Sequence, residues 1–263
     1  MVAPTGALYV LCLSQAHLFT LASTDQGKTF LPRPPRMGGH DLTAYRQLSL
    51  LGRLLRDPIT LFIAEEAGQS GIYGLSFASA AEPSLYGGYR LDDPSEGSVE
   101  SYRALPLGLD SFAITYLKGG SLRSTIVCGS SASPRLTPIA ICDGIDAVVD
   151  YDVFERPEPG HTSFWGYYLA AGHHGERILR DFTVVDGAMV ESAALETAAS
   201  LGNQEVQCYF LSDRSARVLW RNGPRVSSFR GMGGQWQKDG ETFLSGESFT
   251  LFPISDGRAF QVA

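Results

Sequence analysis

The chain has 263 residues, of which 44% are apolar, 11% aromatic and 19% charged. This composition is typical of a folded globular protein, and we expect one soluble domain over residues 1–263. The formal net charge of -7 at pH 7 argues against a nucleic-acid partner, because nucleic-acid footprints are usually basic. No apolar run reaches the roughly 20 residues that cross a bilayer, so no membrane span is expected.

The first 20 residues are apolar but lack the basic segment that begins a secretory signal peptide. We therefore expect them to form a strand of the mature protein. This expectation favours a cytoplasmic or virion-associated protein over a secreted one.

One pattern recurs along the chain: an apolar run, a short polar or glycine-containing turn, and a second apolar run. It predicts β-hairpins at residues 7–23, 60–79, 111–130, 163–185, 206–223 and 249–263. Their starts lie 43 to 53 residues apart, close to the roughly 40 to 50 residues of a four-stranded propeller blade. The sequence therefore predicts an all-β fold, a small β-propeller.

The last hairpin decides the number of blades. If residues 249–263 pair with strands from residues 7–33, the two ends of the chain share one blade and the ring has five blades. If they form a blade of their own, the ring has six. Pairing of the ends removes two exposed sheet edges, so five blades is our prediction.

Helix-like spacing of apolar residues occurs in two segments. These are residues 41–57 and residues 189–202, which also contain good helix formers. The first also reads as a strand of a blade, and the second as a short helix or a loop insertion.

The four cysteines are scattered along the chain. They are Cys12, Cys128, Cys142 and Cys208. No Cys-x-x-Cys spacing indicates a zinc or redox site, so no metal and no other cofactor is expected. A disulfide between Cys128 and Cys142 stays open.

Residues 23–30, with the sequence STDQGKTF, form the clearest motif of the chain. Asp25 can accept hydrogen bonds from its own turn, Gly27 can adopt a positive φ, and Thr29 and Phe30 resume an extended strand. Together with Ser23 these residues predict a structural turn. A shorter echo at residues 239–243, DGETF, predicts an equivalent turn.

The motif resembles the Asp box, Ser-x-Asp-x-Gly-x-Thr-Trp/Phe, of sialidase-type β-propellers and other proteins with bacterial-neuraminidase repeats. The resemblance implies a propeller hairpin. Sialidase activity in that family needs an arginine triad, a tyrosine nucleophile with a glutamate partner, and an Arg-Ile-Pro motif ahead of the first Asp box. Here the nearest match, LPRPPR at residues 31–36, follows the Asp box, so we do not expect an active sialidase.

Several acids and histidines were weighed as catalytic groups, because glycosidases use paired carboxylates. The acids are Asp143, Asp146, Asp150, Asp152, Glu65 and Glu66, and the histidines are His173 and His174 in a glycine-flanked turn. Alternation with apolar residues and closeness to turns favour a structural role for all of them. The catalytic residues, if any exist, stay unknown.

Trp236, Tyr86 and Tyr89 stand next to glycines, and we expect them to be exposed aromatic platforms for a ligand. The sequence therefore favours a non-catalytic binding or assembly module whose ligand is a carbohydrate or a protein. One alternative is a carbohydrate-active enzyme, a glycoside hydrolase or lyase that uses inner-strand carboxylates. Another is a structural component of a virion or other large assembly.

Overall fold

The computed structural model describes residues 6–52, 55, 58–77, 82–94, 97–130, 132–143, 147–155, 161–172, 174–198, 204–210, 216–232 and 235–243. Within these ranges the secondary structure is antiparallel β-sheet, apart from one 3-10 turn, η1 (Tyr86–Gly88), and one isolated parallel bridge. The all-β prediction is confirmed.

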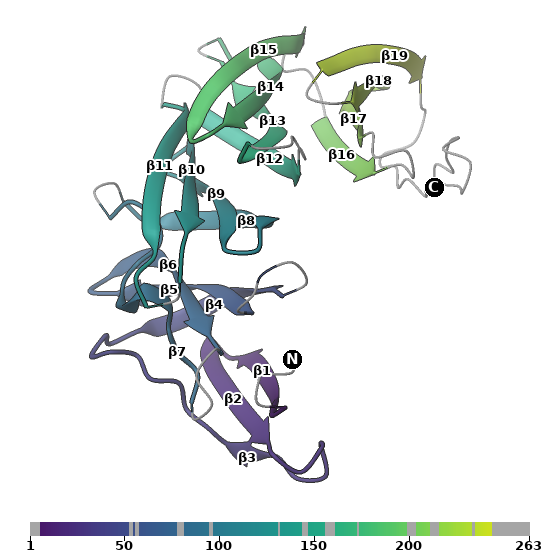
Figure 1. Cartoon of the computed structure of the whole chain (residues 1–263). Coiled ribbons are helices and arrows are strands. Elements are labelled where there is room, and N and C mark those ends of the chain that lie inside the picture. The colour runs from purple at the N-terminus through teal and green to yellow at the C-terminus, as the bar shows by residue number, and fades with distance from the viewer. Residues whose placement is uncertain are drawn as a thin grey trace. The chain divides into compact units, whose positions relative to one another are not determined.

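The strands form five sheets, each made of strands that follow one another in the sequence (Figure 1). Sheet A contains β1 (Leu8–Ser14), β2 (His17–Ser23) and β3 (Leu31–Pro32). Sheet B contains β4 (Thr43–Leu51), β5 (Ile59–Glu66), β6 (Gln69–Ser76) and β7 (Ser84–Leu85). Sheet C contains β8 (Val99–Gly108), β9 (Ser111–Lys118), β10 (Ser121–Cys128) and β11 (Arg135–Cys142).

The two remaining sheets have the same plan. Sheet D contains β12 (Ala147–Glu155), β13 (Ser163–Ala171), β14 (Arg177–Val185) and β15 (Ala188–Ala198). Sheet E contains β16 (Gln204–Phe210), β17 (Ala216–Asn222), β18 (Arg225–Met232) and β19 (Gln235–Phe243).

Five predicted hairpins are confirmed, as β1–β2, β5–β6, β9–β10, β13–β14 and β16–β17. Each lies within its own sheet, as expected for the blades of a propeller, and the number of sheets equals the predicted number of blades. The sixth hairpin, at residues 249–263, lies outside the described residues. Closure of a ring therefore stays a prediction.

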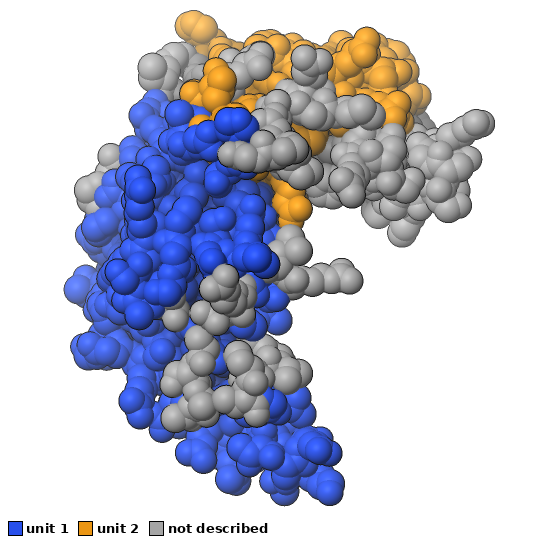
Figure 2. Space-filling model, in the orientation of Figure 1, with its two compact units in different colours: residues 1–144, 159–162, 186–188 blue, residues 145–158, 163–185, 189–263 orange. Residues whose placement is uncertain are grey.

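The chain divides into two compact units (Figure 2). Unit 1 comprises residues 1–144, 159–162 and 186–188 and holds sheets A, B and C. Unit 2 comprises residues 145–158, 163–185 and 189–263 and holds sheet E and nearly all of sheet D. The prediction of a single domain stays a prediction.

The core of unit 1 lies on both faces of sheet B. In β5, Ile59, Leu61 and Ile63 belong to an apolar cluster that continues into sheet C. The alternate residues Phe62 and Ala64 belong to a second cluster, which continues into sheet A. Because both faces of β5 are covered, residues 61–64 are a continuous apolar run rather than an alternating one.

The core of unit 2 is aromatic. Phe154 of β12 and Trp165 of β13 lie in one buried cluster with Trp220 of β17 and Phe229 of β18. The rings of Phe154 and Trp165 lie 5.4 Å apart between centroids. Aromatic rings fill the space between these two sheets.

The described parts of both segments with helix-like spacing contain strands, β4 over residues 43–51 and β15 over residues 188–198. In β4 the register shifts twice, and Ala44 and Gln47 adopt positive φ values of 49° and 50°. Each irregularity inserts one residue into β4, which shifts the following side chains to the other face of the strand. Tyr45 and Leu48, three residues apart, therefore both pack against the cluster that contains Phe62 and Ala64. Apolar spacing of three can thus arise from a twice-bulged strand.

One further expectation was wrong, and the question of the disulfide, which the sequence left open, is answered. Residues 239–243 do not form a turn: they lie in β19, where Asp239 Oδ1 accepts a 2.6 Å hydrogen bond from Ser228 Oγ. Cys128 and Cys142 are free thiols, because they lie at opposite ends of the β10–β11 pair, opposite Arg135 and Leu122.

Candidate functional site

The turn at residues 23–30 is organised by the Asp25 carboxylate. Its Oδ1 accepts hydrogen bonds from Ser23 Oγ (2.7 Å) and Thr29 N (2.9 Å), and its Oδ2 accepts one from Thr29 Oγ1 (2.6 Å). Gly27, with φ of 86°, donates its N–H to Ser23 Oγ at 2.8 Å. The hydroxyl and amide of Thr29, with the Ser23 hydroxyl, lower the pKa of Asp25 to about 2. Phe30, directly before β3, is 39% exposed.

The loop at residues 86–90 places its two tyrosines in different surroundings. Tyr86 is only 2% exposed, its ring lies edge-on to Phe112 at 5.9 Å, and its hydroxyl donates to Gly129 O at 3.1 Å. The expectation of an exposed platform is wrong for Tyr86, because apolar neighbours distant in sequence cover it. Tyr89 is 37% exposed and donates its hydroxyl to Pro134 O at 2.6 Å.

Glycines fix the shape of this loop. Gly87 has φ of 70°, and a Cβ there would lie 2.7 Å from Pro134 Cγ and 3.2 Å from Tyr89 Cε1. Gly88 also has a positive φ, but a Cβ there would meet no atom within 4 Å. A side chain at position 87 would therefore displace Pro134 or the Tyr89 ring, whereas position 88 is limited by its backbone conformation alone.

A small pocket lies beside Tyr86. Its lining comprises Leu55, Ile59, Tyr86, Leu109, Asp110, Phe112 and Gly129. Its volume of about 10 Å³ holds about one water molecule. A sugar or peptide would therefore have to bind on the surface of the loop, rather than inside this pocket.

Trp236 is not an exposed platform either. It is partly buried against the aromatic cluster of unit 2, and its ring lies 5.0 Å from that of Trp165. A Cβ on Gly231 would lie 2.7 Å from the Trp165 ring and 2.8 Å from the Trp236 ring. The expectation of an exposed platform is wrong for Trp236, because the missing side chain of Gly231 leaves room for its ring beside the core.

The acids weighed as catalytic groups serve nearby parts of the chain. In β12, Oδ1 of Asp150 and Oδ1 of Asp152 each accept a 2.9 Å hydrogen bond from the backbone N–H of the following residue. Asp143, whose side chain is 63% exposed, pairs with Arg123 at 3.2 Å. Asp146 lies outside the described residues.

The histidine turn gives no metal site within the described residues. His173 lies outside them, and the backbone N–H of His174 donates to Glu176 Oε2 at 2.9 Å. Among the residues described, no group of three or more histidines, cysteines and acids is placed to hold a metal ion.

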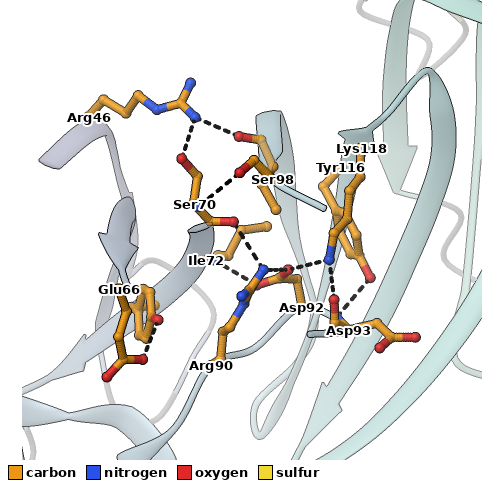
Figure 3. A network of polar contacts seen from close by, with 12 residues as sticks. Arg46, Glu66, Ser70, Ile72, Arg90, Asp92, Asp93, Ser98, Tyr116 and Lys118 are labelled. Carbon is orange, nitrogen blue, oxygen red and sulfur yellow. Dashed lines mark hydrogen bonds and ion pairs between the residues drawn. The ribbon is translucent and has the colours of Figure 1, made fainter. Parts of the chain in front are cut away.

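The sequence reasoning missed a buried ion network between sheets B and C (Figure 3). The Asp92 side chain is 0% exposed. Its Oδ1 accepts hydrogen bonds from Ile72 N (2.8 Å) and Arg90 Nε (2.9 Å), and its Oδ2 from Arg90 Nη2 (2.7 Å) and Lys118 Nζ (3.2 Å). The Lys118 ammonium, 1% exposed, also donates to Asp93 O.

The charges and hydrogen bonds of this network are matched, as a structural role requires. A buried carboxylate is tolerated only when it is paired and hydrogen-bonded, and both Asp92 oxygens accept two hydrogen bonds. Burial alone would lower the pKa of Arg90, but the hydrogen bonds and charge of Asp92 raise it above its usual value. The guanidinium fits because Gly71 has no side chain: a Cβ there would lie 2.4 Å from Arg90 Nε.

One sequence signal could have pointed to this network. Lys118 is one of only three lysines in the chain, and it follows the apolar strand residues ITYL. A lysine in such a position needs an acid, but nothing in the sequence says that Asp92 supplies it.

A second polar cluster joins His40, Glu66 and Tyr73. Tyr73 donates its hydroxyl to Glu66 Oε2 at 3.0 Å, and His40 Nδ1 lies 2.7 Å from Glu66 Oε1. The tyrosine–glutamate pair has the residue types of a sialidase nucleophile and its partner. Tyr73 is 0% exposed, however, and burial, followed by the hydrogen bond to Glu66, raises its pKa. Its hydroxyl is therefore neither accessible nor easily ionised.

No protein-family model matches the sequence, and no curated protein matches it. The fold is similar to two solved structures of β-propeller proteins. One is a candidate 6-phosphogluconolactonase from Bacteroides fragilis, with 11% identity and a TM-score of 0.37 over 95% of this chain and 85% of that one. The other is Hsv2 of Kluyveromyces lactis, with 12% identity and a TM-score of 0.32 over 90% and 83%. Similarities this weak carry no argument about activity or ligand.

Among the described residues no helix is long and apolar enough to cross a membrane.

Proposed function

We propose that this protein is a non-catalytic binding module whose ligand, a carbohydrate or another protein, contacts the loop at residues 86–90. The observation that carries the proposal is the position of Tyr89. The residue is 37% exposed, and its hydroxyl is anchored on Pro134 O at 2.6 Å. An aromatic side chain held in one orientation loses little conformational entropy when a ligand stacks on it.

The environment of the acids supports a non-catalytic role. Asp150 and Asp152 each accept a backbone hydrogen bond from the neighbouring residue, and Glu66 binds His40 and Tyr73. The hydrogen bond with His40 favours the ionised form of Glu66, whereas a general acid must hold its proton near neutral pH. The pKa of Glu66 is indeed lowered, chiefly by the hydrogen bond from His40.

The hydrogen bonds within residues 23–30 also support assigning this segment as an Asp box of the neuraminidase-repeat type. The side chains of Ser23, Asp25 and Thr29 are used inside the turn. The motif accordingly serves the fold, and the proposed ligand contact lies elsewhere.

A glycan array followed by affinity measurements tests the proposal. We expect Tyr89→Ala to weaken binding of a captured glycan about 5- to 150-fold, which corresponds to about 1 to 3 kcal/mol for one stacked ring. Tyr89→Phe keeps the ring and removes only the hydroxyl bond to Pro134, so it should retain most of the affinity. The glycan should be recovered intact.

Two outcomes would contradict this proposal. If Tyr89→Ala and the parent protein bind the glycan with equal affinity, the ligand does not contact the loop at residues 86–90 through Tyr89. Turnover of the glycan that disappears in Asp150→Ala or Asp152→Ala would instead establish the carbohydrate-active enzyme.

An assembly role is the second candidate, and the outer face of sheet A favours it. Val10 and Phe19 are 40% and 52% exposed, and Cys12, paired with Phe19 across the sheet, is also exposed. These residues share one face, because strand residues two apart point the same way. Exposed apolar patches commonly bind other proteins. This role would be favoured if the protein binds no glycan, is retained in a purified particle, and loses that retention in Phe19→Asp.

A further inference from the structure

Residues 36–40 run alongside residues 84–88 as a short strap on the edge of sheet B. Arg36 N donates to Pro83 O at 2.8 Å, Leu85 N donates to Arg36 O at 2.9 Å, and Arg36 forms a parallel bridge with Ser84. At the other end of the strap, His40 Nε2 lies 2.9 Å from Gly88 O. The Arg36–Ser84 bridge and the His40–Gly88 contact each join residues that are 48 positions apart. His40 therefore makes the last contact between the strap and residues 84–88.

Both ring nitrogens of His40 face oxygen atoms that can only accept. Nδ1 lies 2.7 Å from Glu66 Oε1, and Nε2 lies 2.9 Å from the Gly88 carbonyl. A neutral imidazole carries one N–H and can donate only one of these bonds, whereas the imidazolium donates both. The two distances are therefore satisfied together only by the protonated ring.

The charged and titratable groups around His40 come from several segments. Glu66 of β5 is its anionic partner, and Tyr73 of β6 lies edge-on with its ring centroid 6.2 Å away. The positive charge of Arg90, on the loop side, acts on Glu66, and Asp41 follows His40 in the strap. The side chains of His40 and Glu66 are 23% and 35% exposed, so protons from solvent can reach the pair.

We propose that His40 is a pH-responsive clasp, which fastens the loop at residues 86–90 to sheet B when its ring is protonated and releases Gly88 when the ring is neutral. The Gly88 bond is the one lost, because the Glu66 carboxylate is the stronger acceptor and keeps the remaining N–H. The clasp acts on the position of the loop, so it does not depend on which ligand the loop binds.

The pH range follows from the two partners. The bond to Gly88 O, followed by that to Glu66, raises the pKa of His40 above the usual 6.5, and His40 lowers that of Glu66 below the usual 4.5. The His40 contribution is complete below pH 6.5 and is lost as the pH rises through its folded pKa. The Glu66 contribution is complete above pH 4.5 and is lost as the pH falls through its folded pKa. The clasp is therefore at full strength between pH 4.5 and pH 6.5.

Nitrogen-15 NMR of the imidazole rings, recorded from about pH 5 to about pH 9, tests the protonation state directly in the unaltered protein. We expect His40 to carry a proton on both nitrogens at the acid end and to titrate with a midpoint above that of free histidine. A midpoint at or below that of free histidine, or a single N–H at the acid end, would overturn the proposal.

Hydrogen exchange of the backbone amides at residues 86–90 tests the release. After correction for the intrinsic effect of pH, we expect exchange to rise about two- to tenfold as His40 loses its proton, the effect of losing one partly exposed charge-assisted bond. His40→Gln should exchange fast at every pH, without the step. His17→Gln, at an exposed position in β2, is the matched control and should keep the step. A step that persists in His40→Gln would refute the clasp.

Discussion

Sheet A and the junction between sheets B and C each depend on an aspartate, but the two carboxylates differ in reach and burial. Asp25 is partly exposed, and its partners lie two and four residues away in the same turn. Asp92 has a fully buried side chain, and it binds Ile72 and Lys118, 20 and 26 residues away. A local site can be recognised as a sequence motif, whereas a long-range, buried one has no motif.

The sheets themselves show the same contrast. Sheet B has four strands and is packed on both faces, so that residues 59–64 of β5 are all buried. Sheet A has three strands, and Val10 and Phe19 on its outer face are 40% and 52% exposed. Sheet A is therefore the one whose edge and face still offer sites for pairing.

Deleting residues 249–263 should have the largest effect. If this predicted hairpin pairs with the N-terminal strands and supplies the strand that sheet A lacks, its removal exposes two sheet edges, which promote aggregation. We expect the shortened chain to be recovered in inclusion bodies or as large aggregates in size-exclusion chromatography. A monomeric product that unfolds cooperatively would contradict ring closure by the two ends.

Asp92→Ala should have the next largest effect. It leaves the Arg90 and Lys118 charges buried without their shared partner, and breaking such a buried pair costs about 3 to 5 kcal/mol. Urea denaturation monitored by tryptophan fluorescence measures the loss.

Asp143→Ala is the matched control for Asp92→Ala. It removes an ion pair with Arg123 in which the aspartate side chain is 63% exposed, and such a pair contributes at most about 1 kcal/mol. Equal losses of stability in the two variants would mean that burial does not distinguish the two regions.

The sequence predicted the elements whose signal is local. The turns of five hairpins and the hydrogen-bonding residues of the Asp25 turn could be recognised from neighbouring residues alone. The strand at residues 43–51 was harder to recognise, because two register shifts change its spacing from the two of a regular strand.

Exposure could not be judged from neighbours in the sequence. Tyr86 stands beside two glycines, yet Phe112 and Gly129 cover it from sheet C. The roles of Asp92 and Lys118 depend in the same way on the pairing of distant segments. Sequence reasoning therefore selected Tyr89, the one tyrosine of the pair that remains partly exposed, without being able to separate it from Tyr86.

Asp25→Ala should have the smallest effect. It removes the acceptor for three hydrogen bonds within one exposed turn, so we expect the melting temperature to fall by only a few degrees and ligand binding to persist. The pKa of Asp25 is lowered from 3.8 to about 2, so its contribution is complete above pH 3.8 and is lost as the pH falls toward 2. Melting curves of the two proteins should therefore differ at neutral pH and converge in acid. An equal difference at both pH values would show that the carboxylate charge does not organise the turn.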